Sequence, residues 1–511
     1  MTLAQAQEQI RQKDLQLEVL NGELAQTQRM VQALQHQIEQ LTRRLYGPKS
    51  EKYHPGQLLF DKLLIAGLEQ PAGPAPTPPP EVNVRSHTRQ VNGHGREELP
   101  AHLRRVEILL DVPEEEKVCP ETGKPLVKIG EERTEKLAYE AETVYVKVFV
   151  RPKYGSPVKE NGSSVSGITI AALPFFAIAK CKADTTLLAH VAVSKYVDHQ
   201  PLYRQEQILR RESVILSRQT MDGWLMQLAD GPLGLLYDRL KAELLVRDVI
   251  FTDDTPVRLQ IKGRGKTVQA RIWVYRTGPG PPQVVFDFSR DRSKQRPLLF
   301  LGLYRGYVHA DAYSGYDELF TREGIIEVGC WVHARRKFDE AASSSPREAT
   351  EMLALIRRLY QIEDSARDLT NDRRVAIRRE KAQPVILHIV DRAEQMRPGA
   401  LPKSPLGQAL TYLLNQKTAL QCYLQDGRLQ PDNNLAENVL RPLALGRKNW
   451  MFCGSDRGGR AAAIYFSLFQ TCLLNKVNPY AYLHDVLDRI ATHPPDRIAE
   501  LLPYNWTPSA S

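Results

Sequence analysis

The chain has 511 residues, which is too many for a single hydrophobic core. Of these residues, 42% are hydrophobic and 25% are charged, the composition of a soluble globular protein. Its formal net charge of +9 favours a polyanionic partner. Six cysteines lack paired spacing and follow no signal peptide, and no apolar stretch is long enough for a bilayer. We therefore expect a cytoplasmic, multidomain protein without a disulfide framework or a membrane span.

The first 48 residues contain a seven-residue repeat of apolar side chains. One row consists of Leu3, Ile10, Leu17, Leu24, Val31, Ile38 and Leu45, and a second row three residues later includes Leu20, Leu34 and Leu41. A repeat of seven places both rows on one seam of a helix, which another helix must cover. We predict a coiled coil (a leucine zipper) over 1–48 that makes the protein a homo-oligomer. The alternative is a helix that packs back on its own chain.

Two regions of different character follow this helix. Residues 49–98 are predicted to be a basic segment and a proline-rich linker, because the stretch 71–80 (PAGPAPTPPP) cannot form a packed element. A small β-rich module is predicted over 99–181, where apolar and polar residues alternate at 143–150.

Residues 182–247 are predicted to be helical. Helices at 202–210 and 217–228 are separated by a short turn, and Ser217 is suited to cap the second of them. The pair resembles a helix-turn-helix, whose second helix would carry Arg218 and Gln219 into the major groove of DNA. The alternative is an ordinary helical hairpin with Trp224 in its core.

Beyond residue 248 the pattern predicts a mixed sheet. Apolar runs separated by turn residues predict strands at 249–256, 268–277, 283–288, 307–311 and 325–331, with a helix at 292–303. The order β-β-β-α-β-α-β is that of the ribonuclease H-like fold. Asp253 lies in the first strand and Asp311 ends the fourth, and these strands are neighbours in that layout. We therefore expect the two carboxylates to face one another.

Such a pair of carboxylates needs a cation. At about 4 Å, two of them repel by roughly 4 kcal/mol at an effective dielectric constant of 20. They remain ionised only if a cation lies between them. Oxygen ligands without cysteine or histidine select Mg²⁺ or Mn²⁺, and a third acid would complete a two-metal site for attack on a phosphodiester. Each aspartate alone is also compatible with a turn or capping role.

The third acid is Glu437, in the first turn of a helix predicted to begin near Asp432, on the same face as Asn434. Here the sequence closely resembles the transposases of the insertion sequence 66 family, and the resemblance covers nearly the whole chain. The matching segments are RRLYGPKSEK at 43–52, YVDHQPLYRQ at 196–205, DDTP at 253–256, ADAYSGY at 310–316, GCWVHARRKF at 329–338, DNNLAENVLRPLALGRKNW at 432–450, NPYAYL at 478–483 and ELLP at 500–503.

The resemblance implies a DDE-type DNA transposase, which cleaves the ends of a mobile element and joins them to target DNA. It gives the catalytic and metal-binding roles to Asp253, Asp311 and Glu437, with Mg²⁺ or Mn²⁺ as cofactor and Asp254 as the neighbour of the first ligand. A register shifted by one residue would instead turn Asp254 to the other face of the strand. Element ends, target DNA and accessory transposition proteins are the implied partners.

The spacing of the acids predicts the rest of the organisation, an α+β protein of several domains. The 126 residues between Asp311 and Glu437 (437 − 311) exceed what one strand and one helix need. The surplus resembles the helical insertion of the family and lies at 339–423. It would divide a ribonuclease H-like α/β catalytic domain into 248–338 and 424–475, followed by a C-terminal tail at 476–511.

Several cations near the predicted site are candidates for DNA contacts. Those after Glu437 would neutralise phosphates of a DNA end without reading its sequence. Three arginine pairs in the insertion (357–358, 373–374 and 378–379) are either further DNA contacts or part of a solvated face. The predicted DNA-contacting residues are Arg218, Gln219, His333, Arg335, Arg441, Arg447, Lys448 and Asn449.

The resemblance also implies a zinc module before the catalytic domain, with two Cys-x-x-Cys pairs. In this chain only Cys119 remains, since the other three positions are Thr122, Gly155 and Val158, so we predict no zinc there. Cys330 and His333 form a separate Cys-x-x-His pair without a second pair nearby. We expect His333 to act in the active site or to contact phosphate, with a structural role or a role as a metal ligand as the alternatives.

Two other functions are compatible with these residues. An inactive or domesticated copy would keep the fold and bind DNA without cleaving it, although all three acids are present. A general nuclease of the same fold would cleave unrelated DNA equally well, and it would have no need of the zipper.

Overall fold

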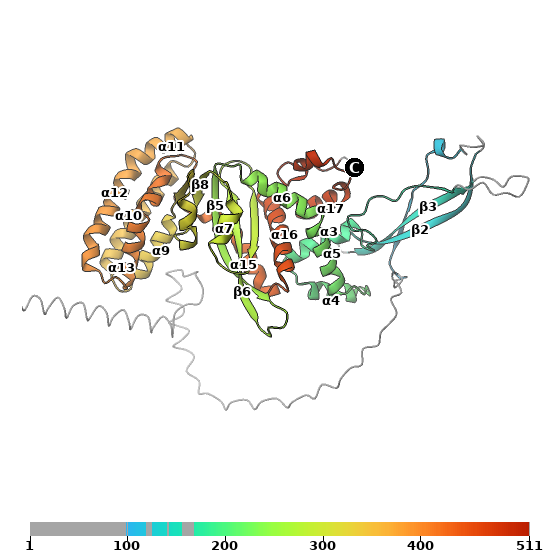
Figure 1. Ribbon diagram of the computed structural model, residues 1–511, viewed down its shortest axis with the longest axis horizontal. Coiled ribbons are helices and arrows are strands. Elements are labelled where there is room, and N and C mark those ends of the chain that lie inside the picture. The colour runs from blue at the N-terminus through green and yellow to red at the C-terminus, as the bar shows by residue number, and fades with distance from the viewer. Residues whose placement is uncertain (1–98, 100, 119–124, 141–142, 156–167, 510–511) are drawn as a thin grey trace, which may run out of the picture. The chain divides into compact units, whose positions relative to one another are not determined.

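The computed structural model describes residues 99, 101–118, 125–140, 143–155 and 168–509 (Figure 1). The predicted coiled coil, the linker and Cys119 lie outside these residues. The fold is mixed α+β with two sheets. Within the described ranges, every helix is too short or too polar to cross a membrane.

A four-stranded sheet forms the first part of the described chain. β1 (Arg105–Leu109) pairs in parallel with β3 (Thr143–Gly155), which also pairs antiparallel with β2 (Val127–Glu140) and β4 (Ile168–Ile170). The alternating pattern at 143–150 therefore does form a strand, and it continues to residue 155. A short 3-10 turn, η1 (Glu114–Glu116), follows β1.

Four helices connect the two sheets along the chain. They are α3 (Thr185–Tyr196), α4 (Leu202–Arg211), α5 (Arg218–Asp230) and α6 (Pro232–Leu244). The predicted cap is present, because the Ser217 side chain accepts a hydrogen bond from Thr220 N–H at 3.2 Å. Trp224 is buried, whereas Arg218 and Gln219 at the start of α5 are exposed. Trp224 is thus part of the core, as in the hairpin alternative, while the first turn of α5 is exposed, as a DNA-reading helix requires.

The second sheet has five strands in the order β7-β6-β5-β8-β9. β5 (Val249–Gln260), β6 (Thr267–Thr277) and β7 (Val284–Ser289) form the predicted antiparallel meander. β8 (Gly306–His309) and β9 (Ile325–Val328) extend it in parallel beyond β5. β9 ends earlier than predicted, because Trp331 begins a helix and its N–H donates to the Pro431 carbonyl at 2.9 Å.

Two helices from the C-terminal part of the chain pack against this sheet (Figure 1). α16 (Asp456–Leu474) covers the edge strand β7, whose backbone N–H groups of Phe286 and Val284 donate to the hydroxyls of Ser467 and Thr471. α15 (Asn434–Trp450) lies along β5. Covering β7 with hydroxyl acceptors removes an open sheet edge.

The remaining helices belong to the loops of the sheet, the predicted insertion and the C-terminal region. They are α7 (Gln295–Leu301), η2 (Ser314–Tyr316), α8 (Asp317–Phe320), α9 (Trp331–Ala341), α10 (Pro346–Ser365), α11 (Asn371–Ile377), the π-helical η3 (Arg378–Ala382), α12 (Gln383–Met396), η4 (Arg397–Gly399), α13 (Pro405–Asn415), α14 (Lys417–Gln421), η5 (Cys422–Leu424), α17 (Pro479–Arg489) and η6 (Pro495–Leu501). Residues 337–350 and 396–409 belong to a second compact unit, separate from the unit that holds both sheets.

Candidate active site

Two aspartates belong to neighbouring strands of the five-stranded sheet: Asp253 lies within β5, and Asp311 lies just after the end of β8. β5 and β8 pair as far as Phe251 and His309, so Asp253 and Asp311 each lie two residues beyond the last paired position. The prediction that Asp311 ends the fourth strand is wrong, because β8 ends at His309 and Asp311 lies two residues beyond it. The sheet thus brings together two acids that are 58 residues apart (311 − 253).

Burial and like charge raise the pKa of both aspartates. The pKa of Asp253 is raised to about 8, first by burial and then by the charge of Asp311, with further contributions from Asp254 and Glu437. Burial also raises the pKa of Asp311, while the charges of His333 and Arg292 oppose that shift. Since the charge of Glu437 acts on Asp253, the three predicted acids share one electrostatic environment.

Asp254 differs chemically from Asp253, although the two are adjacent. Its side chain is 1% exposed and accepts hydrogen bonds from Arg271 Nη1 at 2.9 Å and Arg292 Nε at 2.8 Å. The Asp253 carboxylate instead accepts the N–H of Asp254 at 2.7 Å. Two guanidinium groups neutralise Asp254, which makes Asp253 the better candidate for a metal ligand.

Arg292 is a site residue that the sequence did not indicate. Its Nη2 lies 3.8 Å from Asp311 Oδ2, and its guanidinium lies over the Tyr313 ring at 3.8 Å. Arg292 therefore joins the neutralised Asp254 to the candidate ligand Asp311. A helix was predicted to begin at this arginine, but α7 begins at Gln295, and the loop before it leaves Arg292 free to reach the strand ends.

Glu437 is held by the start of α15. Asn433, which immediately precedes the helix, is buried, and its Nδ2 donates to the Thr252 carbonyl at 2.9 Å. Arg276 Nη1 donates to the Leu435 carbonyl at 2.9 Å. These two bonds fix the first turn of α15, which contains Glu437, against β5 and β6 beside Asp253.

Cys330 and His333 lie against Glu437. The ligand atoms of the three side chains are all within 4.8 Å of one another, and His333 Nδ1 is 3.9 Å from Glu437 Oε1. Burial raises the pKa of the Cys330 thiol to about 12, and its sulfur accepts the Asn433 N–H at 3.3 Å. The neutral thiol thus ties the start of α9 to the start of α15. The spacing along the chain gave no sign of this contact, since Glu437 is 104 residues from His333 (437 − 333).

The three acids offer oxygen ligands of the kind that a hard divalent cation takes, whereas the group of three potential ligands found within 4.8 Å of one another among the described residues is Cys330, His333 and Glu437. Asp311 Oδ1 and Glu437 Oε1 are buried and have no hydrogen-bond partner among the described residues. Such oxygens are costly to bury unless a donor or a cation satisfies them. Carboxylate oxygens are the ligands that Mg²⁺ and Mn²⁺ prefer, and a cation would also remove the repulsion felt by Asp253.

Comparison with known proteins decides the family. The model of the catalytic domain, described as Transposase IS66 family, matches residues 180–461. A second model, the IS66 C-terminal element, matches 467–504, and a third, the leucine-zipper domain described as Transposase C of IS166 homeodomain, matches 33–108. The chain belongs to the IS66 family of DDE transposases.

Relatives of similar length support this membership. An uncharacterised Sinorhizobium fredii protein, y4jD, is 31% identical over 96% of this chain and 98% of its own length. Another from the same organism, y4qI, is 34% identical over 81% of this chain and 78% of its own length. IS66 family membership implies a ribonuclease H-like catalytic domain, a transposase-type enzyme that binds DNA, and catalysis with a divalent metal ion.

The predicted DNA-contacting residues of this IS66 family chain differ in solvent exposure and in their hydrogen bonds within the protein. Arg441, Lys448 and Arg335 are exposed. Arg447 Nη1 is bound to Thr255 Oγ1 at 2.8 Å and to the Pro256 carbonyl, so it joins α15 to β5. Asn449 Oδ1 accepts a hydrogen bond from Arg204 on α4 at 3.4 Å.

Two of the arginine pairs in the insertion are divided between burial and solvent. Arg374 Nη1 donates to the Gly427 carbonyl at 2.7 Å, and Arg378 is 0% exposed, whereas their neighbours Arg373 and Arg379 are exposed. One arginine of each pair is therefore engaged in contacts within the protein. Only the other member is available for DNA.

Replacing Asp253 by Asn should stabilise the metal-free protein at neutral pH. The folded-state pKa of about 8 exceeds the ordinary value of 3.8. Between these values the unfolded chain gives up the proton more readily than the folded chain, so stability falls as pH rises. Asn cannot ionise and avoids this loss. In EDTA near pH 7.5, D253N should unfold roughly 2–5 °C above the wild type, and the difference should vanish near pH 4.

Asp254→Asn is the matched control for this measurement. Its carboxylate is paired with Arg271 and Arg292, so the substitution should lower the unfolding temperature. A D253N protein that unfolds below the wild type near pH 7.5 in EDTA would show that the Asp253 carboxylate is not in a repulsive environment.

Proposed function

We propose that the chain is an active DNA transposase that cleaves the ends of a mobile element and joins them to target DNA. Asp253, Asp311 and Glu437 would hold Mg²⁺ or Mn²⁺. The observation that carries this proposal is the meeting of two partly buried aspartates, one within β5 and one just after β8, with a glutamate on a helix fixed beside β5. When bound, the metal ions would neutralise these carboxylates and activate the water or 3′-hydroxyl that attacks the phosphodiester.

The protein's own residues would supply alignment. Asn433 and Cys330 hold the helix of Glu437 against β5, so the acid keeps its position before substrate arrives. Arg292 offsets part of the negative charge at Asp311. His333 lies beside Glu437, where it could contact a phosphate oxygen of a DNA end or keep the glutamate in place.

DNA recognition would use two surfaces. The exposed first turn of α5, with Arg218 and Gln219, is suited to read base edges in a major groove, because Ser217 caps the helix and Trp224 fixes it in the core. The exposed cations of α15 and of α9 (Arg441, Lys448 and Arg335) would contact phosphates, with Arg447 and Asn449 supporting them.

The domain division remains that of the sequence analysis. The catalytic domain would comprise 248–338 and 424–475, interrupted by the helical insertion at 339–423, and the α3–α6 region would bind the ends. The leucine zipper would pair protomers so that both ends of the element are held together, and accessory transposition proteins would join the complex in the bacterial cytoplasm. The module over 99–181 would work without zinc.

The direct test is an in vitro cleavage assay on the inverted repeats that flank the element, with and without Mg²⁺. The proposal expects nicking at the element ends that depends on the metal, followed by strand transfer. Binding of the repeats without cleavage would identify an inactive DNA-binding copy. Equal cleavage of unrelated DNA would identify a general nuclease.

A further inference from the structure

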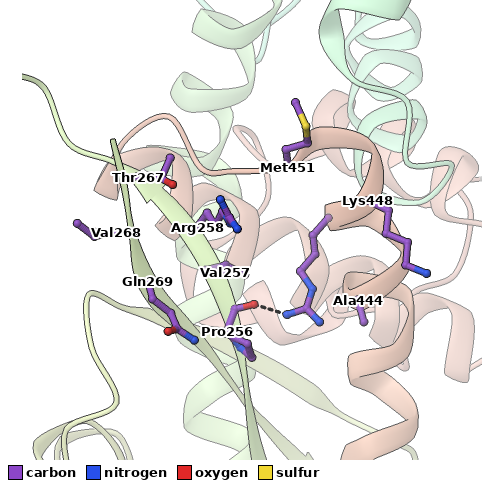
Figure 2. A pocket seen from close by; sticks show the side chains of 10 residues that line it. Pro256, Val257, Arg258, Thr267, Val268, Gln269, Ala444, Lys448 and Met451 are labelled. Carbon is purple, nitrogen blue, oxygen red and sulfur yellow. Dashed lines mark hydrogen bonds between the residues drawn. The ribbon is translucent and has the colours of Figure 1, made fainter. Parts of the chain in front are cut away.

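A cavity of about 630 Å³ lies between the β5–β6 hairpin and the C-terminal half of α15 (Figure 2). We call it the hairpin pocket. Arg258, Thr267 and Gln269 line it from the two strands, and Ala444 and Lys448 line it from the helix, as Figure 2 shows. None of the hairpin residues was among the predicted DNA contacts.

Both walls of the hairpin pocket are fixed by hydrogen bonds. At one end, Arg447 donates from α15 to Thr255 Oγ1 and to the Pro256 carbonyl. At the other, Cys453 N–H donates to the Arg258 carbonyl and Gln260 N–H donates to the Cys453 carbonyl, each at 2.8 Å. Arg447 Nη1 is therefore bonded to the wall of the pocket. The exposed charges of Arg258 and Lys448 remain available to a ligand.

The charged residues of the two chain segments that form the pocket are all basic. Residues 255–270 contain Arg258, Lys262, Arg264 and Lys266 and no acid, and residues 438–455 contain Arg441, Arg447 and Lys448 and no acid. All of these cations except Arg447 are exposed. The positive row continues past the pocket onto the tip of the hairpin, where Lys262, Arg264 and Lys266 lie. A row of this length suits a polyanion better than a single small anion.

The pocket lies on a path that starts at the acids. Along β5, Arg258 is five residues beyond Asp253, about 16 Å at ~3.3 Å per residue, and its side chain lies on the opposite face of the strand from that of Asp253. Along α15, Lys448 is eleven residues beyond Glu437, also about 16 Å at ~1.5 Å per residue. The spacing 437, 441, 444, 448 keeps these positions on one helix face. At a rise of ~3.4 Å per nucleotide, the pocket is roughly five nucleotides from a phosphodiester at the acids.

We propose that the hairpin pocket and the basic hairpin tip hold the phosphates of the DNA strand that continues from the reacting bond. Arg258 and Lys448 contact phosphates at the pocket, and Lys262, Arg264 and Lys266 follow the strand outward. The inference rests on the proposed function, because the path is measured from the candidate catalytic acids. The strand belongs either to the element end or to the target DNA.

Two charge-removing variants of the full-length protein test this proposal. Arg258→Gln/Lys448→Gln removes the pocket cations, and Lys262→Gln/Arg264→Gln/Lys266→Gln removes those of the tip. Arg305→Gln/Lys476→Gln is the matched control, because both residues are exposed, the charge change equals that of the pocket variant, and Arg305 precedes β8 at the end opposite Asp311. Thermal unfolding temperatures should agree among all four proteins.

Binding is measured by fluorescence anisotropy over a series of salt concentrations without divalent ions. One arm uses the uncut element end, and the other uses target duplex added to protein already holding a pre-cleaved end. The pocket variant should bind roughly tenfold more weakly at about 0.1 M salt in one arm, with the slope of log K against log salt reduced by about 1.8 (2 × ~0.9). The arm in which the affinity and the salt slope fall shows whether the pocket holds the element end or the target DNA. The control should change neither value.

The outcomes separate this inference from the proposed function. A salt slope equal to that of the wild type in both arms, for both hairpin variants, overturns the inference even if the wild type cleaves element ends. A wild type that never cleaves but whose pocket variant shows the reduced slope refutes the proposed function and keeps the phosphate-binding path.

Discussion

Glu437→Gln should lose metal-dependent cleavage and strand transfer by about 10³-fold or more, while binding of the element ends is kept. The substitution removes one negative ligand from the acidic site without changing the size of the side chain. Asn433 and Cys330 still hold the start of α15, so the fold and the exposed cations of the helix remain. The measurements are a strand-transfer assay in Mg²⁺ and an electrophoretic binding assay on the same repeats.

An exposed glutamate in the same domain provides the control. Glu323 lies in the turn before β9, and Glu323→Gln should retain wild-type cleavage. Asp253→Asn and Asp311→Asn should behave like Glu437→Gln. Wild-type cleavage by Glu437→Gln would remove this residue from the site and leave the Asp253–Asp311 pair without its third acid.

Arg378→Met should destabilise the insertion by about 3–5 kcal/mol. Arg378 is 0% exposed and forms a two-pronged ion pair with Glu363, with distances of 2.9 and 2.7 Å. It also donates to the carbonyls of Tyr423, Asp426 and Leu429 at 2.7–3.0 Å. Removing it leaves a half-buried carboxylate and three carbonyls without their donor, a loss that the added apolar contacts of Met do not offset.

The neighbouring Arg379 makes this prediction specific. It is exposed, so Arg379→Met should change stability by about 0.5 kcal/mol or less. Differential scanning calorimetry and limited proteolysis of the insertion would compare the two. If both substitutions lowered the unfolding temperature equally, the buried network around Arg378 would not be what holds the insertion. Since Leu429 leads into the segment that carries Glu437, Arg378→Met should also slow cleavage.

Local sequence patterns predicted the elements that position the site. The β-branched run before Asp253 became β5, and two further runs became the rest of the meander, because alternation and turn residues act over short distances. Ser217 caps α5 as predicted, since its hydroxyl needs only a backbone N–H three residues away. The end of β9 was placed too late, because Trp331 is drawn into a helix by contacts with residues 89 and more positions away.

From the sequence alone came the expected neighbours β5 and β8, the three acids as candidate ligands and, through its motifs, membership of the IS66 family. The tertiary structure decided which of two adjacent aspartates is neutralised, because Arg271 and Arg292 reach Asp254 from other parts of the chain. It likewise brought Cys330 and His333 against Glu437, and it buried Arg378 while leaving Arg379 in solvent. Periodicity reports which face of an element is apolar. The partner of a charged side chain depends on which distant segment packs beside it.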